Sequence, residues 1–199
     1  MKQLVLASGN PGKLRELAAI LNDLDYRLSP QAEFDIEEVP ETGTTFVENA
    51  IIKARHAALR ASLPALADDS GIEVDALDGA PGVYSARFSG PGANDASNNA
   101  LLIEKLRDLP AESRTARYRA VIVLMRHAAD PSPLIAEGSW EGIIQLQPSG
   151  TGGFGYDPYF YLPELRCSSA ELSAEEKNRI SHRGKALQQL KQRLLEQGV

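Results

Sequence analysis

The sequence predicts an α/β fold built around a mixed β-sheet, because segments of strand character alternate with segments of helical periodicity. A short apolar run over residues 3–7 is followed by leucines and alanines at helical spacing over 14–21. A helical segment over 95–109, which Pro110 stops, precedes a run over 117–125 that becomes continuously apolar. No internal repeat and no linker marks a boundary, so residues 1–199 are expected to form a single domain.

The composition is that of an ordinary globular protein, with 43% hydrophobic and 24% charged residues among 199. A net charge of -6 argues against nucleic-acid binding, which depends on Lys and Arg to neutralise phosphates. The single cysteine, Cys167, fits a reducing compartment. The N-terminus lacks a secretory signal and no stretch is long enough to span a membrane. We therefore expect a cytoplasmic protein with no membrane partner.

The connection between the first strand and the first helix is Ser8-Gly9-Asn10-Pro11-Gly12-Lys13. Asn10 is placed as the N-cap, Pro11 as the first helical residue and Lys13 in the first turn. Backbone N–H groups, the helix dipole and a Lys ammonium would then converge, which suits a phosphate. It is not a Walker A loop, because its glycines are too close together and Leu14 follows the Lys. The alternative is an ordinary capped helix with a solvated Lys13.

Residues 22–40 are acidic and are expected to form a loop. Thr45 and Glu48 then make a capping box, which predicts a helix running toward Leu63. Glu41 lies outside the box and is either a partner of the helix dipole or a metal ligand. Taken alone, Glu41 favours the dipole role.

Two adjacent carboxylates, Asp68 and Asp69, interrupt an apolar strand-like run over residues 65–74. An ionised carboxylate is costly to bury unless a cation offsets it, so the pair indicates the end of a strand that opens onto a ligand or a metal. Ser70 adds a hydroxyl, and Gly71 permits a tight turn. The alternative is that the four residues are only an acidic turn.

A Gly- and Pro-rich stretch over residues 77–92 is expected to be a loop with a short ordered middle. Its Tyr84 and Arg87 favour an anchor for the loop or a contact with a partner subunit over a ligand contact. Further strands are expected over residues 134–136 and 140–146.

The segment Gly152–Tyr161 has the most unusual composition in the chain. Glycines on both sides of Phe154 expose its ring, which suits stacking on a planar base, an interaction worth about 1 to 3 kcal/mol. The alternative is an aromatic core plug beside a Pro turn, and for residues 159–161 this alternative is preferred.

Near the C-terminus, Ser173 and Glu176 form a second capping box. Ser181 is expected to cap the last helix, which places His182 and Arg183 in its first turn, one or two turns after Lys177. Such a cluster of donors favours an anion or a carbonyl-bearing ligand. A solvated charged face is the alternative.

Together these segments indicate a nucleotide site, and they resemble the inosine triphosphate pyrophosphatase family in family order over nearly the whole chain. The segments that carry the resemblance are residues 8–13, 41–50, 67–71, 153–158 and 181–183. It implies Mg²⁺-dependent hydrolysis of non-canonical purine nucleoside triphosphates (dITP, ITP and XTP) to the monophosphate and pyrophosphate, which keeps inosine and xanthine bases out of DNA and RNA. It also implies an elongated, two-lobed homodimer subunit with the active-site cleft between the lobes.

The resemblance assigns roles residue by residue. Glu41 and Asp69 would hold Mg²⁺, and Asp69 would also accept a proton from the attacking water. Substrate would be bound by Ser8, Gly9, Asn10, Pro11, Gly12, Lys13 and Ser70 at the phosphate end, together with Lys177. Phe154 would stack on the base, and the edge of the base would be read by Tyr156, Asp157, His182 and Arg183. Gly155 is a further substrate-binding residue.

Three other functional hypotheses remain open at this point. A related Maf-like pyrophosphatase would act on modified pyrimidine nucleotides, but His182 with Arg183 and the Phe154 loop favour a purine. A nucleotide-binding sensor without turnover is a more distant alternative, against which Glu41, Asp69 and Lys13 count. The third is a structural protein whose motifs are all turns and caps.

Overall fold

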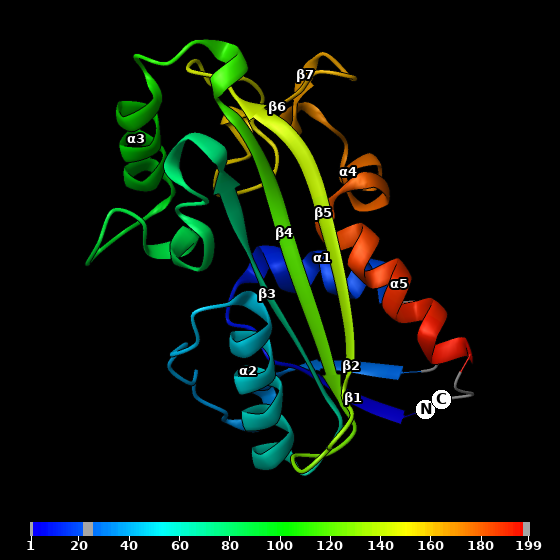
Figure 1. The fold of residues 1–199 in the computed structure, drawn as a ribbon. Coiled ribbons are helices and arrows are strands. Elements are labelled where there is room, and N and C mark those ends of the chain that lie inside the picture. Colours follow the sequence, from blue (N-terminus) through cyan, green and yellow to red (C-terminus); the bar gives the residue numbers. More distant parts are fainter. Residues whose placement is uncertain (1, 22–25, 197–199) are drawn as a thin grey trace. The chain divides into compact units, whose positions relative to one another are not determined.

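A computed structural model describes residues 2–21 and 26–196. Within these residues the strands form one seven-stranded sheet in the order β2-β1-β3-β4-β5-β6-β7 (Figure 1). The strands are β1 (Lys2–Leu6), β2 (Tyr26–Pro30), β3 (Ala65–Val74), β4 (Thr115–Met125), β5 (Leu134–Ile144), β6 (Phe160–Leu162) and β7 (Cys167–Ser168). The helices are α1 (Pro11–Leu21), α2 (Phe46–Ala61), α3 (Asp95–Leu106), α4 (Ala174–Ile180) and α5 (His182–Glu196).

The sheet is mixed, as expected. Strand β1 pairs in parallel with β2 and with β3, whereas β6 pairs antiparallel with β5 and with β7. The α/β fold class is therefore confirmed. No helix of the described residues combines the length and the apolar character that crossing a bilayer requires.

The chain divides into two compact units. Unit 1 comprises Met1–Asp69, Ala120–Gly138 and Arg183–Val199, and unit 2 comprises Ser70–Arg119 and Ser139–His182. Each unit is described by itself below. The expected cleft between lobes stays a prediction.

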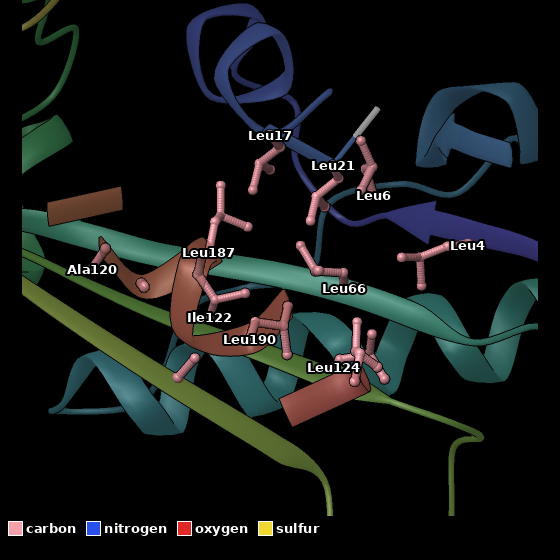
Figure 2. Packing of buried hydrophobic residues seen from close by; sticks show 13 residues of the cluster. Leu4, Leu6, Leu17, Leu21, Leu66, Ala120, Ile122, Leu124, Leu187 and Leu190 are labelled. Atoms are coloured by element: carbon pink, nitrogen blue, oxygen red, sulfur yellow. The ribbon is translucent and has the colours of Figure 1, made fainter. Parts of the chain in front are cut away.

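Unit 1 buries both faces of its part of the sheet, because side chains alternate along each strand. Leu4, Leu6 and Leu66 pack in one cluster with leucines of α1 and α5 (Figure 2). Their strand neighbours Val5, Ala65 and Ala67 belong to a second cluster that includes the buried alanines of α2. Helices α1 and α5 therefore cover one face of this part of the sheet, and α2 covers the other.

Unit 2 has a more aromatic core. Trp140 of β5 and Phe160 of β6 lie 5.5 Å apart between ring centroids, and Leu102 and Leu106 of α3 are fully buried in the same cluster. Phe160 is completely buried, which confirms the prediction of a core role at this residue, while Tyr159 and Tyr161 on either side are half-buried.

Both capping boxes are confirmed, at Thr45 with Glu48 for α2 and at Ser173 with Glu176 for α4. The expectation of a loop over residues 22–40 is wrong from Tyr26 to Pro30, where β2 pairs with β1; residues 22–25 lie outside the described part. Strand β2 has a mixed, partly polar composition, so an apolar run does not reveal it.

Two element boundaries also differ from the expectation. Helix α3 ends at Leu106, because the following residues turn before Pro110. Strand β5 is continuous from Leu134 to Ile144, where two strands were expected, since its central Gly138 and Ser139 keep an extended backbone despite their low strand propensity.

The hydrogen bonds at the start of α2 should make part of the free energy of unfolding depend on pH. Hydrogen bonds from Thr45 and Thr44 lower the pKa of Glu48 from its ordinary value of 4.5. A carboxylate with a lowered folded-state pKa stabilises the fold above its ordinary pKa, and this contribution is lost as pH falls through the folded-state value. Glu48→Gln should therefore be less stable than the parent near pH 7, with the difference shrinking near pH 3. Urea unfolding at the two pH values checks this, and an equal difference at both would contradict it.

Candidate functional site

The loop before α1 folds as a capped helix start. Asn10 Oδ1 accepts hydrogen bonds from the backbone N–H groups of Gly12 (2.8 Å) and Lys13 (3.2 Å), and Ser8 Oγ accepts from the N–H of Asn10 (3.2 Å). These N–H groups, which the sequence suggested for a phosphate, are thus used within the loop. A phosphate here would have to compete with Asn10 for them.

Strand β3 runs without interruption from Ala65 to Val74, so the acidic-turn alternative is wrong and the two carboxylates lie within a strand rather than at its end. Because successive strand side chains point to opposite faces, the side chains of Asp68 and Asp69 lie on opposite faces of β3 and pair with different cations. Asp68 follows Leu66 onto the face that α1 and α5 cover, and Asp69 follows Ala67 onto the face that α2 covers.

Asp68 is the centre of a buried ion cluster. Its Oδ2 lies 2.9 Å from Lys13 Nζ and 3.3 Å from Arg183 Nη2, and Arg183 also pairs with Glu16. Burial acts to raise the pKa of Asp68, but Arg183 and Lys13 outweigh it and hold that pKa far below its usual range. Burial lowers the pKa of Lys13, although the negative charge of Asp68 acts to raise it. Lys13 is therefore not a solvated surface lysine, and that alternative is wrong.

Asp69 meets a different cation. Lys53 Nζ donates to Asp69 Oδ1, to Glu41 Oε1 and to the backbone oxygen of Asp68, each at 2.8 Å. Lys53 thus joins the two residues that the resemblance names as metal ligands. Burial acts to lower the pKa of Lys53, but Asp69 and Glu41 reverse this and the net shift is upward.

Lys53 is the functional candidate that sequence reasoning missed. It lies on the same stripe of α2 as the buried residues Ala50, Ala54 and Ala57, at helical spacing from them. A lysine within an otherwise apolar stripe of small residues is the signal that could have found it, since such a charge needs a partner.

Hydrogen bonds hold the segment that carries Glu41. The N–H of Gly43 donates to Asn49 Oδ1 (2.8 Å), and the N–H groups of Thr44 and Thr45 donate to Glu48 Oε2 (2.9 and 3.0 Å). A Cβ on Gly43 would lie 2.6 Å from that of Glu48, so glycine is required for this close approach. The capping box of α2 therefore also helps to hold the residues that follow Glu41 in place.

The donor set around Asp69 fits a magnesium ion. Asp69 Oδ2 is buried and has no hydrogen-bond partner among residues 2–21 and 26–196, although an oxygen of this kind normally finds one. Mg²⁺ typically takes one or two protein carboxylates and completes its shell with phosphate oxygens and waters. Burial raises the pKa of Asp69, with Lys53 acting against it.

In unit 2, Phe154 lies in a network around Asp157. Asp157 Oδ2 accepts from the N–H of Phe154 (2.8 Å) and from Lys177 Nζ (2.6 Å), and Asp157 Oδ1 accepts from Ser169 Oγ (2.8 Å). Lys177 Nζ also lies 5.1 Å from the centroid of the Phe154 ring. The structure therefore places Lys177 beside the expected base-stacking residue and its Asp.

Tyr156 and His182 lie among core aromatics of unit 2. The Tyr156 hydroxyl donates to the backbone oxygen of Ser85 (2.7 Å), and burial raises the pKa of this hydroxyl. The His182 ring stacks on Tyr118 with centroids 4.7 Å apart and an angle of 10° between planes.

The donors near the C-terminus are buried. Exposed fractions are 6% for Lys177, 4% for His182 and 2% for Arg183, so the solvated-face alternative is wrong for all three. Within unit 1 the structure groups Lys13, Asp68 and Arg183, and separately Glu41, Lys53 and Asp69. Within unit 2 it groups Phe154, Asp157 and Lys177, whereas Ser70 is half-buried on β3.

Comparisons with known proteins extend over nearly the full chain. Residues 4–193 match the family model described as the Ham1 family. Proteins named dITP/XTP pyrophosphatase are similar to it: that of Xylella fastidiosa is 59% identical over 191 residues, 96% of each chain, and that of Vibrio cholerae is 54% identical over 99% of this chain and 98% of its own. The solved structure of a HAM1 protein from Coxiella burnetii has a TM-score of 0.91 and 51% identity, covering 98% of this chain and 100% of that one. A Ham1 protein of Staphylococcus aureus has a TM-score of 0.86 and 40% identity over the full length of both chains. This chain therefore belongs to the Ham1 family.

Proposed function

We propose that this protein is a nucleoside-triphosphate pyrophosphatase that hydrolyses dITP, ITP and XTP to the monophosphate and pyrophosphate. The observation that carries the proposal is that Glu41 and Asp69 both accept hydrogen bonds from Lys53, while Asp69 Oδ2 is buried and finds no hydrogen-bond partner in the described part of the chain. Relatives 54 to 59% identical that are named dITP/XTP pyrophosphatase supply the substrate class. Removing these nucleotides would keep inosine and xanthine bases out of DNA and RNA.

Glu41 and Asp69 are the residues that would hold Mg²⁺, and the metal when bound would offset charge on the phosphate chain. Asp69 is also the proposed proton acceptor for the attacking water. Burial raises the pKa of Asp69, which makes its carboxylate a stronger base, while the ammonium of Lys53 favours the ionised form that a base requires. Lys53 orients both carboxylates by donating to one oxygen of each.

Lys13 would neutralise phosphate charge. Further substrate contacts are proposed for the preceding residues of the same segment, Ser8, Gly9, Asn10, Pro11 and Gly12. Asp68 holds Lys13 at 2.9 Å, so Lys13 keeps a counter-charge when no substrate is bound. Because Asp68 also holds Arg183, the same carboxylate fixes the first turn of α5. Ser70 would add a hydrogen bond to the substrate.

The base would stack on Phe154 and be read by neighbouring donors. Hypoxanthine and xanthine carry a 6-oxo acceptor where adenine carries an amino donor, so a donor from His182 or Arg183 would leave adenine facing donor against donor. Such a mismatch can be worth a factor of about 10⁴ in selectivity. We include Gly155, Tyr156 and Asp157 in this part of the site, whereas Lys177 is proposed to neutralise the phosphate chain together with Lys13. A single catalytic domain over residues 1–199, a homodimer and a cytoplasmic location are part of the same proposal.

The experiment that tests the proposal is a substrate panel. Release of pyrophosphate is measured from dITP, XTP, dGTP and dATP, with Mg²⁺ and with the metal removed by a chelator. We expect turnover of dITP and XTP that requires Mg²⁺ and little turnover of dATP. The panel also includes a modified pyrimidine triphosphate, and nucleotide binding is measured separately. Tight binding without turnover would instead support a sensor, and turnover confined to the modified pyrimidine would support a Maf-like enzyme.

A further inference from the structure

The loop that carries Phe154 has a backbone that is costly to hold in one conformation. Gly153 and Gly155 have φ angles of 74° and 63°, in the left-handed region that favours glycine. Glycines lose more conformational freedom on ordering than other residues, so a ring between two of them is costly to hold in one orientation. Contacts from outside the loop must therefore order it.

Helix α3 supplies two of these contacts, both to Gly155. Asp95 Oδ2 accepts a hydrogen bond from the N–H of Gly155 (2.7 Å), and Asn99 Nδ2 donates to the carbonyl oxygen of Gly155 (2.9 Å). Asp95 and Asn99 are four residues apart and so lie on the same face of the helix. Asn99 Nδ2 also donates to the backbone oxygen of Asp95 (2.8 Å), which fixes the orientation of the amide.

These bonds hold the peptide groups on both sides of Gly155, and with them the position of Phe154. The N–H of Gly155 belongs to the peptide that follows Phe154, and Asp95 holds it. The peptide that precedes Phe154 is held by Asp157, which accepts from the N–H of Phe154 (2.8 Å). With both adjoining peptide planes held, the direction of the Cα–Cβ bond of Phe154 is set.

We propose that Asp95 and Asn99 are positioning residues that prepare Phe154 to stack on the base. The inference rests on the proposed function, in which Phe154 is the stacking residue. Order that exists before the nucleotide binds removes part of the entropy cost of binding. Since stacking helps the bound substrate and the transition state alike, losing this order should weaken binding with little change in the chemical step.

The test compares three variants of α3. Asp95→Ala removes the bond to Gly155, and Asp95→Asn keeps an acceptor oxygen at the same place. Asn94→Ala is the matched control, because Asn94 caps the same helix through the N–H of Ser97 (3.0 Å). We expect Asp95→Ala to raise KM for dITP about tenfold with kcat changed by less than about twofold, Asp95→Asn to restore most of the loss, and Asn94→Ala to leave KM unchanged. Asn99→Ala should resemble Asp95→Ala.

A second readout does not depend on activity. Hydrogen exchange of the Gly155 amide in the nucleotide-free protein should become faster in Asp95→Ala and stay slow in Asn94→Ala. In the Phe154→Ala background, Asp95→Ala should add no further increase in KM, because the two residues act through one ring.

The possible outcomes distinguish a failure of the positioning role from a failure of the proposed function. If Phe154→Ala raises KM but Asp95→Ala and Asn99→Ala do not, the positioning role is overturned and the stacking role stands. An equal effect of Asp95→Ala with and without the Phe154 ring would also overturn it. If Phe154→Ala leaves KM for dITP unchanged, the stacking role in the proposed function fails, and the inference fails with it.

Discussion

Asp69→Asn should reduce pyrophosphate release from dITP by about 10³-fold while leaving the protein folded. The amide cannot accept the proton of the attacking water, and it removes one of the two negative charges proposed to hold Mg²⁺. It keeps an oxygen that can accept from Lys53 Nζ, which lies 2.8 Å from Asp69 Oδ1. The measurement is kcat with saturating Mg²⁺, alongside the urea midpoint of unfolding.

The control for this result is Asp75→Asn, because Asp75 is a half-exposed carboxylate of unit 2 that pairs with Arg117 at 2.8 Å. It should keep near-parental kcat, since Asp75 is not among the residues proposed to hold the metal, accept the proton or bind the substrate. An Asp69→Asn variant that retained more than about a tenth of the parental kcat would exclude Asp69 as the general base.

Asp68→Asn, one residue earlier, should act mainly on stability. Lys13 and Arg183 lie 2.9 and 3.3 Å from Asp68 Oδ2, and the Asp68 side chain is fully buried. Removing one member of a buried ion cluster leaves the other charges uncompensated, which costs about 3 to 5 kcal/mol in the free energy of unfolding. The measurement is urea unfolding, read by circular dichroism.

Two comparisons make this second prediction sharp. Asp75→Asn should shift the urea midpoint less, because the Asp75 side chain is 44% exposed whereas that of Asp68 is fully buried. A further variant, Asp68→Asn with Arg183→Met, should recover part of the loss, since it removes a buried charge together with its partner. An Asp68→Asn protein as stable as the parent would contradict this prediction.

The elements with strong local signals could be predicted from the sequence. Thr45 with Glu48 and Ser173 with Glu176 are capping boxes at short range, and each starts a helix in the structure. Strand β2 could not be predicted in this way, because Tyr26–Pro30 becomes a strand through pairing with β1 rather than through its own composition. Residues close in sequence determine where these helices are capped, whereas pairing with another strand determines that residues 26–30 form β2.

Asp68 and Asp69 show the same limit of prediction from sequence, here at the candidate site. The sequence indicated that Asp68 and Asp69 need cations, but not that the strand continues through them and sends them to opposite faces. Their partners come from distant segments: Lys13 and Arg183 for Asp68, and Lys53 for Asp69. Lys53 carried only a weak signal, a charge within an apolar stripe, and its importance appears once the fold brings Glu41 and Asp69 to it.

In unit 2 the exposed-ring argument for Phe154, whose stacking role stays a prediction, gave no indication of what supports the residue. The bonds that hold its neighbour Gly155 come from Asp95 and Asn99 of α3, a helix for which the sequence offered no functional reading. Helical spacing indicates that two residues share a face, but it does not reveal which loop that face meets.

The central claim is a reaction, and the identity of its products tests it most directly. Purified protein is incubated with dITP and Mg²⁺, and the products are followed by phosphorus NMR. We predict dIMP and pyrophosphate in equal amounts, with neither formed when Mg²⁺ is removed. Formation of dIDP and inorganic phosphate, or dITP that remains intact with Mg²⁺ present, would contradict the account.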